Sequence, residues 1–296
     1  MIENWEEYKV FEKNLKSFLN SVNAIPKIKK ALIYAISAGG KRTRPLIVLL
    51  SGKMCGGSYE NLMNLALSVE LIHTASLVHD DVIDKAEKRR RKRALHREYD
   101  VSLAIVLGDW LISKSVELTS EYGKEIIRDF SFVGLMMSEG EIMDIYSVRG
   151  NFNEDDYFKC IALKTAYLFA YSAKSACKVV CNDEKAAEKL YSYGYNLGLA
   201  YQLVDDLLEY VKALDDKCSF FESKTLPLIY EETYGKKEAI ARVVELIGEY
   251  SKRSVNALNY FEECEEKEKL VKIVDYMTFD MLKRYEKTSG KEIISF

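Results

Sequence analysis

Apolar residues recur every three to four positions along most of this chain, and residues that break helices are rare. That spacing places the apolar side chains on one face of a helix. The sequence holds only three prolines, Pro26, Pro45 and Pro227, and a proline inside a helix costs about 3 kcal/mol. No segment has the convincing alternation of a strand. The pattern therefore predicts an all-α fold.

The expected helices are separated by glycines and polar stretches, at 39–40, 56–57, 88–93, 150–151, 182–183 and 213–223. We expect helices over 4–21, 26–38, 44–55, 59–84, 100–121, 123–148, 155–182, 184–212, 226–249 and 251–287, the last broken once. Several are long and apolar over a wide arc, which is typical of a large helical bundle whose central helices are covered by others.

Composition narrows the class of protein further. The 296 residues contain no Pro/Gly/Ser-rich linker, so we expect one domain over 1–296. A net charge of −3 with 48% hydrophobic residues indicates a soluble globular protein and argues against a nucleic-acid partner. No apolar run approaches the roughly 18 residues of a membrane span. The acidic segment 1–7 does not match a signal peptide, which favours the cytoplasm.

Two acidic motifs with the same spacing lie within apolar helical stretches. They are Asp80-Asp81-Val-Ile-Asp84 and Asp205-Asp206-Leu-Leu-Glu209. Carboxylates four residues apart project from the same side of a helix and repel one another. Such oxygen ligands suit Mg²⁺, which also bridges to the phosphates of a substrate. One cluster alone would indicate a solvated charged face, but the repetition favours two metal-binding motifs that face each other across a central cavity.

Two basic segments accompany these motifs, the run 88–93 and the segment Gly39-Gly40-Lys41-Arg42-Thr43-Arg44-Pro45. A basic run can be a nuclear-localisation or nucleic-acid patch, but its place beside a candidate Mg²⁺ site favours binding of phosphate oxygens. The second segment opens a helix, and a helix N-terminus beside Lys41 and Arg44 is a ready anion site. Two acidic sites with two or three basic sites imply two phosphorylated substrates.

Helical spacing adds further candidates. His73 shares a stripe with Asp80 and Asp84, because offsets of seven and eleven residues are close to whole turns. A histidine on such a helix is compatible with either a packed core residue or a functional one. Gln202 shares a stripe with Asp205, and Gly198 one turn earlier permits the close approach of a neighbour or a ligand.

These residues resemble the trans-isoprenyl diphosphate synthase (polyprenyl synthetase) family. The motifs that carry the resemblance lie at 39–45, 70–84, 89–90, 108–111, 164–165 and 198–206. The resemblance implies a helical bundle of the isoprenoid synthase type. It also implies an enzyme that condenses isopentenyl diphosphate with an allylic diphosphate, head to tail, and a homodimer.

By the same resemblance, catalysis is expected of Asp80, Asp81, Asp84, Lys164, Thr165, Gln202 and Asp205. Of these, Asp80, Asp84 and Asp205 are expected to bind about three Mg²⁺ ions. The groups expected near them are Asp81, Asp206 and Glu209. The allylic diphosphate would contact Arg89, Lys164, Thr165 and Gln202, and isopentenyl diphosphate would contact Lys41, Arg44, His73 and Arg90.

The sequence departs from the family pattern at three positions. Glu209 stands where an aspartate is usual, and Arg91 where a glycine commonly follows the arginine pair. Ser223 replaces an expected lysine, for which Lys217 or Lys224 is a candidate substitute.

In this family the residues four and five positions before the first motif gate product length. Here they are Ser76 and Ala75, both small, so the resemblance implies a product of C20 or longer. Two alternatives stay open. A class I terpene cyclase ionises one diphosphate and needs no second anion site, whereas a non-catalytic regulatory subunit would be expected to lose acidic residues.

Overall fold

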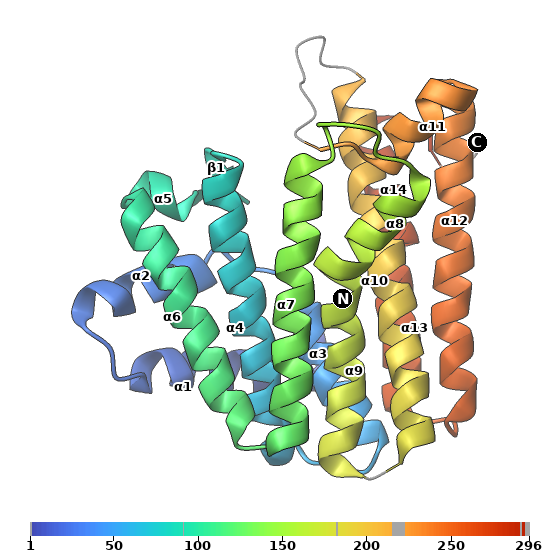
Figure 1. Cartoon of the computed structure of the whole chain (residues 1–296). Helices are drawn as coiled ribbons and strands as arrows, with labels where there is room; N and C mark the ends of the chain where they lie inside the picture. Colours follow the sequence, from blue (N-terminus) through green and yellow to red (C-terminus); the bar gives the residue numbers. More distant parts are fainter. Residues whose placement is uncertain (1, 91, 182, 215–222, 291, 294–296) are drawn as a thin grey trace. The chain divides into compact units, whose positions relative to one another are not determined.

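The structure is a computed structural model, and it describes residues 2–90, 92–181, 183–214, 223–290 and 292–293 (Figure 1). The chain forms two compact units, Met1–Phe130 and Ser131–Phe296. Their boundary falls within the long helix α7 (Lys124–Tyr146). The described residues of both units are almost entirely helical, which confirms the all-α prediction. The single domain over 1–296 stays a prediction.

The first unit is built around a long core helix. Its helices and strands are α1 (Glu6–Ser21), α2 (Pro26–Ile36), α3 (Thr43–Met54), α4 (Tyr59–Ile83), β1 (Lys88–Arg89), β2 (Lys92–Arg93), α5 (Leu95–Glu98) and α6 (Val101–Ser120), with a 3₁₀ turn over Ile2–Asn4. The side chain of Ser58 accepts a hydrogen bond from Asn61 N and so caps α4. α4 packs against α3 and α6 and is buried around most of its circumference.

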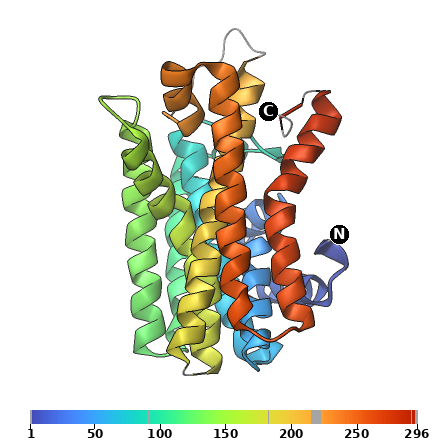
Figure 2. The ribbon, with the colours of Figure 1, turned by 90° about the vertical axis from the view of Figure 1, so that its right-hand side faces the viewer.

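The second unit is arranged around α10. Its helices after α7 are α8 (Glu154–Ile161), α9 (Tyr167–Val180), α10 (Glu184–Ala213), α11 (Leu226–Tyr234), α12 (Lys236–Ala257), α13 (Glu265–Met277) and α14 (Phe279–Ser289). A π-helical turn, Ala162–Ala166, joins α8 to α9, and a 3₁₀ turn covers Leu258–Tyr260. Asp183 caps α10 by accepting from Ala186 N. α10 packs against α9 and α12, and both views show α10 and α12 running side by side (Figures 1 and 2).

Three details differ from the sequence predictions. The helix expected over 226–249 is broken at Gly235, whose φ of 79° lies in the left-handed region that favours glycine. The helix expected over 251–287 is divided, because α12 continues to Ala257 and α13 and α14 follow. The basic run, for which no strand was expected, contains the short antiparallel pair β1–β2. Arg91 within it lies outside the described residues.

Among the described residues, one helix, α4, is long and apolar enough to cross a membrane by length and composition alone. However, 72% of its most apolar stretch is buried inside the protein. Burial of this kind is typical of a core helix in a folded domain.

Candidate active site

The first acidic motif lies at the C-terminal end of α4, and its carboxylates differ in how far they are exposed to solvent. Asp80 is half-buried and Asp84 is exposed, whereas Asp81 is only 2% exposed. The Asp81 carboxylate accepts hydrogen bonds from Arg89 Nε at 2.8 Å and from Arg89 Nη2. Carboxylates here add to the negative end of the helix dipole, which favours binding of a cation. Asp81 therefore orients Arg89, and the two more exposed carboxylates are suited to a metal ion.

The basic residues of the first unit gather around His73. Arg44 Nη1 lies 3.2 Å from His73 Nε2. A Cβ added to Gly40 would lie 2.8 Å from Arg90 Nη1, so the Arg90 guanidinium rests against this loop. Burial, together with the positive charge of Arg44, lowers the pKa of His73 well below its ordinary value. His73 is then neutral, and its Nε2 accepts from Arg44. Arg44 therefore contacts His73, and the Arg90 side chain lies against Gly40.

Arg42 fixes the loop that carries Lys41 and Arg44, and the sequence reasoning missed it. Its φ of 52° is left-handed, and its guanidinium is buried. Arg42 Nη1 donates to Glu70 on α4, Nε donates to Glu12 on α1 at 2.8 Å, and Nη2 donates to the Ile36 carbonyl. A signal was present in the sequence, because Glu70 is an acidic residue inside the apolar stretch that also carries His73.

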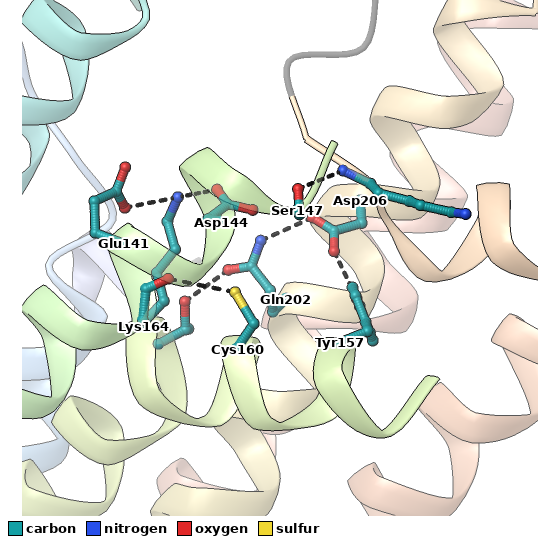
Figure 3. Close-up of polar contacts among 11 residues, drawn as sticks. Glu141, Asp144, Ser147, Tyr157, Cys160, Lys164, Gln202 and Asp206 are labelled. Atoms are coloured by element: carbon teal, nitrogen blue, oxygen red, sulfur yellow. Dashed lines mark hydrogen bonds and ion pairs between the residues drawn. The ribbon is translucent and has the colours of Figure 1, made fainter. Parts of the chain in front are cut away.

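In the second unit, Lys164 and Thr165 lie in the π-helical turn (Figure 3). Such turns occur often at functional sites. Lys164 Nζ forms ion pairs with Glu141 Oε2 at 2.9 Å and Asp144 Oδ2 at 2.6 Å, both on α7. Burial acts to lower the pKa of Lys164, but Asp144 and Glu141 outweigh it and raise this pKa. Lys164 therefore stays protonated.

Glycine allows α7 to approach the π-helical turn closely. A Cβ at Gly140 would overlap the backbone of Lys164. The Gly140 carbonyl also accepts a hydrogen bond from Cys160 Sγ at 3.4 Å. Sequence reasoning did not single out Gly140, Glu141 or Asp144. The available signal was a pair of acidic residues three positions apart, which lie on one face of the expected helix.

A chain of hydrogen bonds continues from Thr165 into the interior (Figure 3). Thr165 Oγ1 donates to Gln202 Oε1 at 2.7 Å, and Gln202 Nε2 donates to Asp206 Oδ1 at 2.9 Å. The hydroxyl of Tyr157 donates to Asp206 Oδ2 at 2.5 Å. Burial raises the pKa of Asp206 to about 7, although the bonds from Tyr157 and Gln202 oppose that shift. Tyr157 was not among the predicted site residues.

The second acidic motif has the same pattern of exposed and buried carboxylates as the first. Asp205 and Glu209 are exposed, whereas Asp206 is buried and holds polar partners. A Cβ at Gly198 would lie 2.5 Å from Ala166 Cα, so the predicted close approach of a neighbour at this glycine is confirmed. α10 therefore presents Asp205 and Glu209 outward while it packs tightly against the turn that carries Thr165.

The remaining predicted positions are less informative. Lys224 Nζ pairs with Glu232 Oε2 at 3.1 Å, and its backbone N donates to Ser147 Oγ. Lys217, the other candidate substitute for the lysine missing at Ser223, lies outside the described residues. In α4, Ala75 is fully buried and Ser76 is half-buried.

A profile of the polyprenyl synthetase family matches residues 25–218. The chain belongs to the polyprenyl synthetase family. This confirms the resemblance, and as a polyprenyl synthetase the chain is a trans-prenyltransferase. It is 41% identical over 281 residues to the geranylfarnesyl diphosphate synthase of Methanosarcina mazei, with 95% of each chain covered.

Solved structures of this family have the same fold. A geranyltranstransferase from Methanosarcina mazei matches with a TM-score of 0.83 and 38% identity, over 95% of this chain and 100% of that chain. A polyprenyl synthase from Caulobacter crescentus CB15, crystallised with calcium and isoprenyl diphosphate, matches with a TM-score of 0.82 and 26% identity, over 91% and 94%. These matches confirm the predicted fold class.

Proposed function

We propose that this polyprenyl synthetase condenses isopentenyl diphosphate with an allylic diphosphate, head to tail, to give an all-trans polyprenyl diphosphate of C20 or longer. The observation that carries the proposal is that the two acidic motifs have the same pattern of exposed and buried carboxylates. In each motif the first and fifth carboxylates are directed outward, and the second is buried and orients a polar partner. The family membership and the high coverage of the geranylfarnesyl diphosphate synthase support the same activity.

The proposed metal is Mg²⁺, and the donor set fits it. Asp80, Asp84 and Asp205 offer hard carboxylate oxygens from half-buried or exposed positions, the ligands that Mg²⁺ prefers. We propose about three ions for each active site. When bound, Mg²⁺ would neutralise the charge that builds on the leaving diphosphate.

The protein's own cations would hold the two substrates. We assign isopentenyl diphosphate to the group Lys41, Arg44, His73 and Arg90, and the allylic diphosphate to the group Arg89, Lys164, Thr165 and Gln202. An ammonium group has three N–H donors, and the two carboxylates on α7 account for two of those of Lys164. The third N–H donor of Lys164 is suited to a hydrogen bond with a phosphate oxygen. The bonds from Asp81 hold the Arg89 guanidinium in one orientation.

The reaction follows from this assignment. The allylic C–O bond breaks, and its electron pair leaves with the diphosphate. The double bond of isopentenyl diphosphate then attacks the allylic cation and forms the new C–C bond. Loss of a proton to the released diphosphate restores a double bond. The oxygen atoms of Thr165 and Gln202 would stabilise the positive charge while it exists.

The proposed product length rests on the small residues Ala75 and Ser76. No aromatic ring stands at these positions to stop the growing chain. The relative named geranylfarnesyl diphosphate synthase supports a long product.

Labelled isopentenyl diphosphate supplied with C5, C10 or C15 allylic starters tests the proposal, with the dephosphorylated products separated by chromatography. We expect products of C20 or longer, formed only with Mg²⁺. Termination at C15 would contradict the proposed length. A hydrocarbon formed from the allylic substrate alone would indicate a terpene cyclase, and no turnover by this chain alone would indicate a regulatory subunit.

We also propose a homodimer. Phe132, Leu135, Ile142 and Tyr146 lie along one side of α7 and are 48%, 62%, 57% and 56% exposed. A row of large exposed apolar side chains is typical of a protein interface. We also propose the cytoplasm as the compartment, because the six cysteines are scattered through the sequence without the regular spacing of a disulfide framework.

A further inference from the structure

Tyr157 lies outside every sequence motif of the proposed site, yet its hydroxyl donates a hydrogen bond to Asp206 of the second acidic motif (Figure 3). Its side chain, on α8, is 2% exposed. A buried phenol needs a partner for its O–H group, and a backbone carbonyl is enough, as for Tyr193, which donates to the Leu270 carbonyl. Tyr157 instead donates to the carboxylate of Asp206. That choice of partner connects Tyr157 to the side chains expected to contact the allylic substrate.

The carboxylate of Asp206 determines which end of the Gln202 amide faces it. Both carboxylate oxygens of Asp206 accept hydrogen bonds in the structure, whereas an amide has a donating and an accepting end. Gln202 must therefore turn Nε2 toward Asp206, as its 2.9 Å bond shows. The bond from Tyr157 occupies the other carboxylate oxygen and holds the carboxylate in place.

The orientation of the amide in turn determines what Thr165 meets. Gln202 Oε1 accepts the Thr165 hydroxyl proton at 2.7 Å. Because this bond uses the hydroxyl proton of Thr165, the lone pairs of Thr165 Oγ1 and one lone pair of Gln202 Oε1 stay available. Both oxygens then present negative charge. In the reversed amide orientation, Nε2 would face Thr165, and its N–H groups would repel a nearby cation.

We propose that Tyr157 is a positioning residue that acts through Asp206 to keep the amide oxygen of Gln202, rather than its nitrogen, directed at Thr165. The inference rests on the proposed function, because the orientation affects the rate only if an allylic cation forms beside these oxygens. It predicts that Tyr157 acts on the chemical step and not on the binding of isopentenyl diphosphate.

The test compares Tyr157→Phe with the matched control Tyr193→Phe. Each change removes one buried hydroxyl and keeps the ring, and thermal unfolding measures the loss of stability that each one causes. We expect Tyr157→Phe to lower kcat about tenfold, because a small misplacement of a catalytic group is costly. The KM for isopentenyl diphosphate should stay unchanged. Tyr193→Phe should change kcat by less than about twofold.

A double-mutant cycle with Gln202→Leu separates positioning from packing. Without the amide there is nothing left to orient, so adding Tyr157→Phe to Gln202→Leu should lower kcat no further. Each kcat is expressed per folded protein, so a loss of folded protein caused by Tyr157→Phe does not enter the comparison. Equal kcat for the two tyrosine variants, or an undiminished effect of Tyr157→Phe in the Gln202→Leu background, would overturn the inference. A wild-type chain that makes no prenyl product would instead overturn the proposed function.

Discussion

Residues that never touch a substrate in this proposal still determine where the reacting groups point. Asp81 holds Arg89, Asp206 holds Gln202, and the Glu70 carboxylate holds Arg42. Each is a buried acidic residue that accepts from a polar side chain of the site or from its supporting loop. A buried acceptor left without its donor is costly. The site is therefore as sensitive to these buried carboxylates as to the exposed ones.

The two acidic partners of Arg42 should differ in their effect on stability. Glu70 is 5% exposed at its side chain and Glu12 is 39% exposed. Breaking a buried pair costs about 3 kcal/mol, whereas an exposed pair is worth about 1 kcal/mol or less. We expect Glu70→Gln to lower the free energy of unfolding by the larger amount, with Glu12→Gln as the control, as measured by urea denaturation.

The same pair of variants tests the link to the substrate. Glu70→Gln frees the loop that carries Lys41 and Arg44, so it should raise the KM for isopentenyl diphosphate several-fold. Glu12→Gln should leave that KM close to the wild-type value. An equal effect of the two changes would contradict the account of Arg42 as an anchor.

His73 makes the stability of the free protein depend on pH. Its pKa in the folded state is lowered by burial and by Arg44, whereas in the unfolded chain it is about 6.5. Below that pH the unfolded state binds a proton that the folded state does not, so stability is lost as pH falls. We expect His73→Gln to reduce the decrease in unfolding free energy between pH 7.5 and pH 5.5, measured in urea. Identical pH dependence in the two proteins would exclude this effect.

At the scale of elements, the close packing of α7 and α10 against the π-helical turn determines where Lys164 and Thr165 lie. Gly140 and Gly198 permit this contact, because a Cβ at either would meet backbone atoms of the turn. An element that must approach backbone atoms this closely has no tolerance for a side chain.

Gly140→Ala and Gly248→Ala should have opposite effects. Both glycines lie within helices, where alanine is favoured over glycine by about 1 kcal/mol. A Cβ at Gly248 would meet only Phe279 Cζ, at 3.8 Å, so Gly248→Ala should raise the melting temperature. Gly140→Ala forces α7 away from Lys164 and should lower both the melting temperature and kcat. A stabilised, fully active Gly140→Ala variant would contradict the importance of this contact.

The sequence predicted most helices, and two pairs of its candidate site residues are in contact, Arg44 with His73 and Thr165 with Gln202. A long stretch of apolar residues at helical spacing, bounded by glycine or polar residues, predicts a helix, so α4 and α10 were expected close to their observed bounds. The break at Gly235 was missed because a glycine within a periodic pattern is often tolerated. The partners of Lys164, namely Glu141 and Asp144, come from a separate helix, and no local pattern pairs residues across helices. Tyr157 was missed because a buried tyrosine resembles ordinary core.

At the scale of the whole molecule, product length should depend on the residues before the first motif. The relatives include a geranylfarnesyl diphosphate synthase, and Ser76 is small and half-buried. Ser76→Phe introduces a ring at one of the two positions proposed to gate chain growth. We expect this variant to shorten the main product, measured by chromatography of the dephosphorylated chains. Leu77→Phe, which adds a ring at the neighbouring position, should leave the product length unchanged.

The proposed function requires the two acidic motifs to act together on one diphosphate. Crystals grown with Mn²⁺ and an unreactive allylic diphosphate analogue, with anomalous scattering used to locate the ions, test it most directly. We predict metal ions bound by Asp80 and Asp84 and by Asp205, all in contact with the same diphosphate. Ions absent from these carboxylates, or a diphosphate bound away from one of the motifs, would contradict the account.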